Sequence, residues 1–93
     1  MPENWKMLTT PVQFWYWMQK GQYVFTFVTD IEIFFFEENE ILYFACETKV
    51  GSGKYDVRIT NKEYIDKYLD KAFSKGYMFH VDTVTNRYKE VSA

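Results

Sequence analysis

His80 and Asp82 are the two residues whose types and spacing come closest to a catalytic arrangement. Residues two apart on a strand point to the same face of a sheet, where a carboxylate can orient an imidazole for acid–base catalysis. The sequence places no serine or cysteine nucleophile beside this pair, and a lone histidine on a sheet is more often a plain polar residue. We therefore expect a protein that is not an enzyme.

Residues 51–54, Gly-Ser-Gly-Lys, have the residue types of a phosphate-binding loop but not their order. That loop needs GxxxxGK[ST] between a strand and a helix, so that backbone amides and the helix N-terminus surround the phosphate. Here Tyr55 follows the lysine and begins a strand-like segment, so we expect a flexible hairpin turn. One histidine and one cysteine, Cys46, do not furnish a tetrahedral metal site, and no cofactor is expected.

Length and composition bound the class of protein. The chain has 93 residues, of which 47% are hydrophobic and 22% aromatic. This predicts a single domain over residues 1–93 with a modest core. The first residues, MPENWKML, lack the features of a signal peptide, and no apolar run approaches the roughly 20 residues that span a bilayer. We expect a soluble, cytoplasmic protein with no membrane partner.

Two helices are predicted from capping signals and hydrophobic periodicity. Residues 10–13, Thr-Pro-Val-Gln, have the order of a capping box with proline at the first helical position, so a helix should cover residues 11–20. Residues 60–63, Thr-Asn-Lys-Glu, predict a second capping box and a helix over residues 61–75. A glycine follows each segment and should end the helix.

Alternating side-chain types predict the strands, over residues 22–28, 31–36, 41–48, 55–59 and 77–84, with or without a last strand over 88–91. The predicted fold is α+β: an antiparallel four- to six-stranded sheet and two helices packed on one face, in the order α-β-β-β-β-α-β(-β). Residues 1–8 should form an irregular N-terminal arm. Thr29-Asp30 lacks glycine, which leaves open a hairpin or one bulged strand. The residues expected to be buried together are Phe14, Met18, Phe25, Phe35, Phe44, Leu69 and Phe73.

The segment Ile31–Glu47 is the most informative part of the chain, because both faces of its predicted hairpin carry aromatic residues. Either both faces are covered, or one face shows Phe34 and Phe36 to a partner. If the helices cover the face bearing Ile33 and Phe35, the other face carries an apolar centre with a charged rim, which is typical of an association surface. The residues of this predicted surface are Phe34, Phe36, Tyr43, Met78 and His80, with Glu32, Glu47, Asp56 and Arg58 around them. The alternative is that Trp5 or the last strand covers this face.

Charge is distributed unevenly along the chain. Residues 1–48 hold seven acidic and two basic side chains, a net charge of −5, whereas residues 49–93 have a net charge of +3. The aromatic hairpin is therefore the acidic part of the chain and would repel phosphate, which argues against direct nucleic-acid binding. The tight acidic turn of this hairpin, Glu37-Glu38-Asn39-Glu40, favours a basic partner.

These observations lead to the hypothesis of a small non-enzymatic protein-binding module. It would act as an inhibitor or adaptor, of the kind that viruses or mobile elements encode, by occupying another protein such as a nucleic-acid-processing or defence enzyme. The alternatives are a small-ligand or nucleotide-binding protein with a pocket between sheet and helix, and a self-associating subunit that forms homo-oligomers. The predicted partner-binding residues are Glu32, Phe34, Phe36, Glu37, Glu38, Tyr43, Glu47, Arg58 and His80.

Overall fold

The computed structural model describes residues 4–86, which form a sheet and two helices. The predicted α+β class and the predicted order of elements are confirmed, with one further strand before the first helix. The predicted last strand over 88–91 lies outside the described residues. The elements are β1 (Trp5–Leu8), α1 (Pro11–Gln19), β2 (Val24–Val28), β3 (Ile31–Glu38), β4 (Ile41–Glu47), β5 (Tyr55–Thr60), α2 (Lys62–Ser74) and β6 (Phe79–Asp82).

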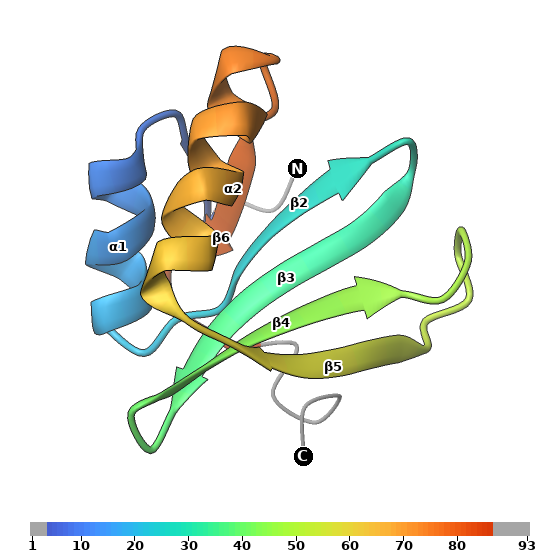
Figure 1. The fold of residues 1–93 in the computed structure, drawn as a ribbon, viewed down its shortest axis with the longest axis horizontal. Helices are drawn as coiled ribbons and strands as arrows, with labels where there is room; N and C mark the ends of the chain where they lie inside the picture. The colour runs from blue at the N-terminus through green and yellow to red at the C-terminus, as the bar shows by residue number, and fades with distance from the viewer. Residues whose placement is uncertain (1–3, 87–93) are drawn as a thin grey trace.

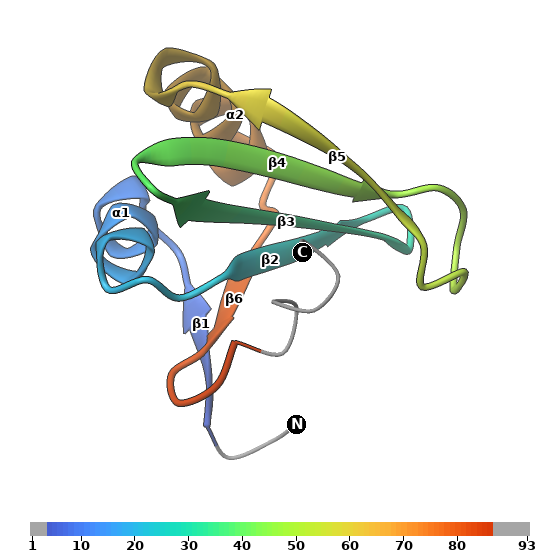
Figure 2. The ribbon, with the colours of Figure 1, turned by 90° about the horizontal axis from the view of Figure 1, so that it is seen from below.

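The sheet has six strands in the order β1-β6-β2-β3-β4-β5, and every neighbouring pair is antiparallel. The strands β2 to β5 follow one another as a meander, and α2 then returns the chain so that β6 pairs with β2 (Figure 1). Figure 2 shows β5 at one border of the twisted sheet and β1 toward the other. The expected irregular arm is wrong for Trp5–Leu8, because these residues pair with β6, with Lys6 opposite Val81.

Local capping chemistry sets where both helices begin. The predicted capping box of α1 is confirmed: Thr10 Oγ1 accepts a hydrogen bond from the Gln13 amide at 3.2 Å, and Gln13 Oε1 accepts one from the Thr10 amide at 3.2 Å. The second helix begins one residue later than the predicted box requires. Thr60 still pairs with Leu42 in the sheet, and the N-cap is Asn61, whose Oδ1 accepts from the Tyr64 amide at 2.8 Å.

The tight turns between β2 and β3 and between β3 and β4 contain no glycine. Thr29 and Asp30 have φ values of 46° and 66°, and Asn39 and Glu40 have φ values of 53° and 65°. Positive φ at both central residues is the type I′ geometry, whose twist matches that of the flanking strands. The register Val28 opposite Ile31 decides the open alternative in favour of a hairpin.

The helices and one face of the sheet share the larger hydrophobic core. Figure 1 shows the two helices next to each other, and their buried side chains join those of the sheet in one cluster. Phe14, Met18, Phe35 and Leu69 lie in this core as predicted, while Phe44 and Phe73 are half-buried against it. The buried members are Leu8, Phe14, Met18, Val24, Ile33, Phe35, Ile65, Leu69, Ala72, Phe79 and Val81.

The opposite face of the sheet carries a second hydrophobic cluster, the aromatic cluster, which the prediction treated as an association surface. Its buried members are Tyr23, Phe25, Phe34, Phe36 and Ala45, and Phe34 and Phe36 are 0% and 1% exposed. Trp5 of β1 packs edge-on against Phe25, with ring centroids 4.9 Å apart. The prediction that Phe25 joins the helix-side core is therefore wrong, because its register opposite Phe34 places it on the other face.

Candidate functional site

The structure brings most of the predicted partner-binding residues to one face of the sheet but does not leave them open. Phe34 and Phe36 are buried, and Tyr43 is half-buried against Phe36. They form a core rather than a surface, because the aromatic side chains pack on one another within the cluster. Of the two alternatives that the sequence left open, exposure of Phe34 and Phe36 is therefore wrong, and the structure agrees with the alternative in which Trp5 packs on this face.

Arg58 lies on the other face of the sheet from this cluster. It pairs with Phe44 and Asp56 pairs with Cys46, so both charged side chains share the face on which the helices lie. The register of β5 against β4 decides which face carries Arg58, because a shift of one residue would exchange the two faces of the strand. The prediction that Asp56 and Arg58 lie around the aromatic cluster is therefore wrong.

Glu32 and Glu47 share the face of the aromatic cluster and are held by hydrogen bonds within the chain. The carboxylate of Glu47 accepts from the Gly53 amide at 2.9 Å and from the Glu32 amide at 3.2 Å. These backbone donors, Gly53 first, lower the pKa of Glu47 below its ordinary value. The carboxylate of Glu32 accepts from the hydroxyl of Tyr55. Glu47 therefore stabilises the β4–β5 loop through its hydrogen bond from Gly53.

His80 stacks on Phe25 in the aromatic cluster, with ring centroids 5.5 Å apart. Its Nδ1 atom is buried and has no hydrogen-bond partner, and burial lowers the pKa of the imidazole. The carboxylate of Asp82 accepts from the Val84 and Thr85 amides, both at 2.9 Å, and from the Thr85 hydroxyl at 2.7 Å. Asp82 thus supports the turn that follows β6. Among residues 4–86, no group of three or more His, Cys, Asp or Glu could hold a metal ion.

The most promising binding feature is a groove that sequence reasoning did not find, of about 640 Å³ beside α1. One wall is the outer side of α1, and the other is the end of the β3–β4 hairpin with the first residue of α2. Val12 and Tyr16 stand out in it, because they are 79% and 51% exposed. The lining residues are Pro11, Val12, Trp15, Tyr16, Gln19, Glu37, Glu40, Leu42 and Lys62.

The amphipathic pattern of α1 explains why apolar side chains line this groove. Phe14 and Met18 turn toward the core, and residues at a spacing of four, such as Val12 and Tyr16, lie on a neighbouring side of the helix. The capping box fixes where the helix starts and therefore which residues face out. The signal in the sequence was the large apolar content of α1, which exceeds what one buried stripe requires.

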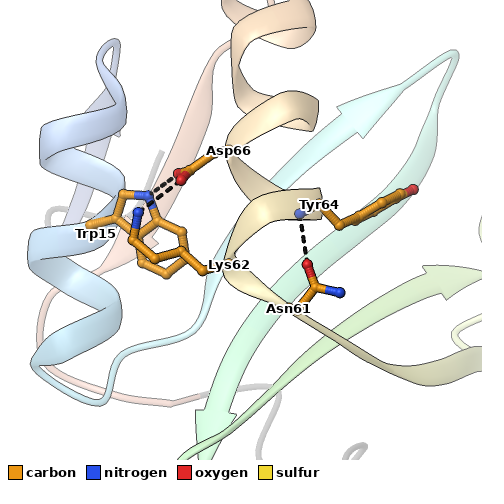
Figure 3. A network of polar contacts seen from close by, with 5 residues as sticks. All are labelled: Trp15, Asn61, Lys62, Tyr64 and Asp66. Carbon is orange, nitrogen blue, oxygen red and sulfur yellow. Dashed lines mark hydrogen bonds and ion pairs between the residues drawn. The ribbon is translucent and has the colours of Figure 1, made fainter.

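A polar network holds the Trp15 wall of the groove against α2 (Figure 3). The indole Nε1–H of Trp15 donates to Asp66 Oδ1 at 2.8 Å, and Lys62 Nζ donates to Asp66 Oδ2 at 2.7 Å. Lys62 Nζ also lies 5.2 Å from the centre of the Trp15 ring, where a cation is attracted to the π face. The hydrogen bond from Lys62, and then that from Trp15, lower the pKa of Asp66.

The β3–β4 turn gives the groove an acidic rim. Glu37 and Glu40 line it, and Glu38 follows on the opposite face of β3; all three are exposed. The ammonium group of Lys62, across the groove, is engaged by Asp66. The arrangement is an apolar wall beside carboxylates that form no ion pair within residues 4–86, which suits binding of an apolar group that carries positive charge.

No protein-family model, curated protein or solved structure matches this chain. No helix in the part of the chain that the structure describes is long and apolar enough to cross a membrane. The chain is thus a small α+β domain with a groove beside α1.

Proposed function

We propose that this protein is a non-enzymatic protein-binding module, an inhibitor or adaptor that acts by occupying a partner protein. The observation that carries the proposal is the groove beside α1, where Val12 and Tyr16 are exposed next to Glu37 and Glu40. Large apolar side chains that stay exposed beside charged groups are typical of association sites. We thus propose binding at this groove, and no longer at the acidic aromatic sheet face that the sequence suggested.

The partner's chemistry follows from the two halves of the groove. Tyr16 and Trp15 offer flat apolar area at little cost in side-chain entropy, and Trp15 is held by its hydrogen bond to Asp66. Glu37 and Glu40 favour a lysine or an arginine. The ligand that fits is therefore a partner segment that places an apolar side chain against α1 and a basic side chain against the β3–β4 turn.

A peptide-display selection against the immobilised protein tests this proposal, because it does not require the natural partner to be identified first. We expect enriched peptides that combine apolar residues with Lys or Arg. Tyr16→Ala should weaken the binding of such a peptide by about 1–3 kcal/mol. The matched control is Tyr64→Ala, because Tyr64 is 50% exposed on α2 but does not line the groove. Equal loss in both variants, or loss in the control alone, would contradict the proposal.

The acidic rim has its own pair of variants. Glu37→Lys should weaken peptide binding and reverse its dependence on ionic strength, because the attraction to a basic side chain becomes a repulsion. Asp70→Lys makes the same change of charge at an exposed position of α2 and should leave both properties nearly unchanged. Peptide binding that is indifferent to Glu37→Lys would remove the acidic rim from the account.

A small apolar ligand is the second candidate, and the volume of the groove favours it. About 640 Å³ lies within the roughly 300–1,000 Å³ that is usual for small-molecule sites. Native mass spectrometry of the protein purified from its source separates the two functions. A bound small molecule that Tyr16→Ala releases would favour the ligand, whereas a bare protein that selects peptides would favour the partner.

A further inference from the structure

The strand β5 lies at a border of the sheet, with β4 as its strand neighbour on one side (Figure 2). Among residues 4–86, no strand pairs along its other side. The border strand at the opposite end, β1, has only four residues, whereas β5 has six. An edge strand presents backbone N–H and C=O groups that can pair with another chain.

The hydrogen-bonding phase of β5 determines which residues offer their backbone groups. The Thr48 amide donates to the Lys54 carbonyl at 2.8 Å, so these two residues are a directly bonded pair of the antiparallel ladder. Bonded pairs recur at every second residue, which directs the backbone groups of Asp56 and Arg58 toward β4. The backbone groups of Val57 and Ile59 therefore point outward from the sheet.

The side chains of β5 carry two opposite charges on one face. Asp56 and Arg58 are both exposed and lie on the helix side of the sheet, and neither belongs to an ion pair within the described part of the chain. Ile59, on the opposite face, is 70% exposed. A strand that alternates these residues has an apolar side, a charged side and outward backbone groups.

Self-pairing of this edge satisfies all three features in one register. In an antiparallel pair of β5 strands with the two-fold axis at Val57, Val57 faces its own copy and exchanges backbone hydrogen bonds with it. Asp56 of one copy then lies opposite Arg58 of the other, twice, and Ile59 lies opposite Tyr55. Opposite charges directly across an antiparallel pair are stabilising, and like charges are destabilising.

The neighbouring registers that keep the outward groups paired are disfavoured by charge. Moving the axis to position 56 places the two Asp56 side chains opposite each other, and moving it to position 58 does the same for the two Arg58 side chains. The order acid–apolar–base therefore favours the register centred on Val57 over the two adjacent registers.

We propose that β5 is the interface of a symmetric dimer of this chain, in which the sheet continues through both copies with Asp56 opposite Arg58. No residue of β5 lines the groove beside α1, so the dimer would present two grooves, and its formation does not depend on the function proposed for them. A binder with two equivalent sites gains avidity for a partner that displays repeated segments.

Sedimentation equilibrium of the full chain over a range of micromolar concentrations, with charge variants, tests the proposal. The wild type should show a monomer–dimer equilibrium. Asp56→Arg and Arg58→Asp should each weaken it about ten-fold or more, because two attractive cross-strand pairs become two repulsive ones. The double variant D56R/R58D should restore it, and an equimolar mixture of the two single variants should form a heterodimer.

Two further variants separate the interface from the fold. Asp70→Arg changes the charge as Asp56→Arg does, but on the exposed side of α2, and should leave the dimer unchanged. Val57→Pro removes an outward N–H that does not bond to β4. This variant should stay folded by circular dichroism and should be monomeric by sedimentation equilibrium. A wild type that stays monomeric throughout the range, or a dimer that the single charge variants and Val57→Pro leave intact, would overturn the proposal.

Discussion

The ring of Tyr43 stacks on the ring of Phe36, with centroids 4.7 Å apart and an angle of 10° between the ring planes. On its other side Phe36 stacks on Tyr23, at 4.5 Å and 4°, so three rings from neighbouring segments form one parallel column. The column belongs to the aromatic cluster and places Phe36 in a hydrophobic interior. The hairpin Ile31–Glu47 is thus buried on both faces, and binding is expected elsewhere, in the groove beside α1.

The first prediction concerns the burial of the aromatic cluster. Phe34→Ala should lower the free energy of unfolding by about 3–5 kcal/mol, because it removes a fully buried ring and leaves a cavity. Ile59→Ala is the control on the same face of the sheet, and should cost less than about 0.5 kcal/mol in a monomeric sample. Urea unfolding measures both. Similar small losses in the two variants would show that Phe34 is not a core residue.

The second prediction concerns the turn between β2 and β3. Thr29, a β-branched residue, has a φ of 46°, a conformation that asparagine adopts more readily, and Asp30 has a φ of 66°, which glycine adopts without strain. The double variant T29N/D30G should therefore raise the free energy of unfolding by about 1 kcal/mol. Thermal and urea unfolding at matched pH provide the measurement. A destabilised variant would argue against type I′ geometry at this turn.

The third prediction is a pH dependence of stability that originates at His80. Burial lowers the pKa of His80 in the folded state, so the unfolded chain binds the proton first, near the ordinary value of about 6.5. The contribution of the uncharged His80 to the free energy of unfolding is complete above that pH, and it is lost as pH falls from there through the folded-state pKa. Unfolding curves between pH 8 and pH 5, experimental settings on either side of that value, should show this decline.

The control for this prediction is His80→Phe, which keeps an aromatic ring against Phe25 and removes the titrating group. Its stability should vary less with pH over the same interval, and it no longer buries the Nδ1 atom that lacks a partner. An unchanged pH dependence in His80→Phe would assign the titration to another group.

Local signals in the sequence were sufficient for the elements and for part of the core. Thr10 and Gln13 determine the start of α1 through neighbours in the chain, and the periodicity of α2 places Leu69 inward without tertiary information. The strand β1 was beyond such signals, since Lys6 pairs with Val81, far along the chain, and four residues hold too little alternation to predict a strand. The assignment of faces failed at Arg58 for a related reason, because the loop before β5 sets its register.

The candidate site was less predictable than the fold because it is assembled from distant residues. The indole of Trp15 and the carboxylate of Asp66 meet only once both helices have packed on the sheet, and each residue alone is an ordinary member of its helix. Glu37 and Glu40 were recognised as an acidic turn, but their neighbours across the groove were not. The exposure of Val12 and Tyr16 follows from the rotation of α1 that turns Phe14 and Met18 inward, but a groove forms only where the β3–β4 turn supplies the second wall.

The most direct test of binding at the groove is an NMR titration of the labelled protein with a selected peptide, followed at the tryptophan indole N–H signals. The chain has three tryptophans, and they report on different places. Trp15 lines the groove, whereas Trp5 packs on Phe25 in the aromatic cluster. We predict that the Trp15 signal, together with the amides of α1 and the β3–β4 turn, shifts on binding while the Trp5 signal stays in place. Shifts at Trp5 with an unchanged Trp15 signal would contradict the account.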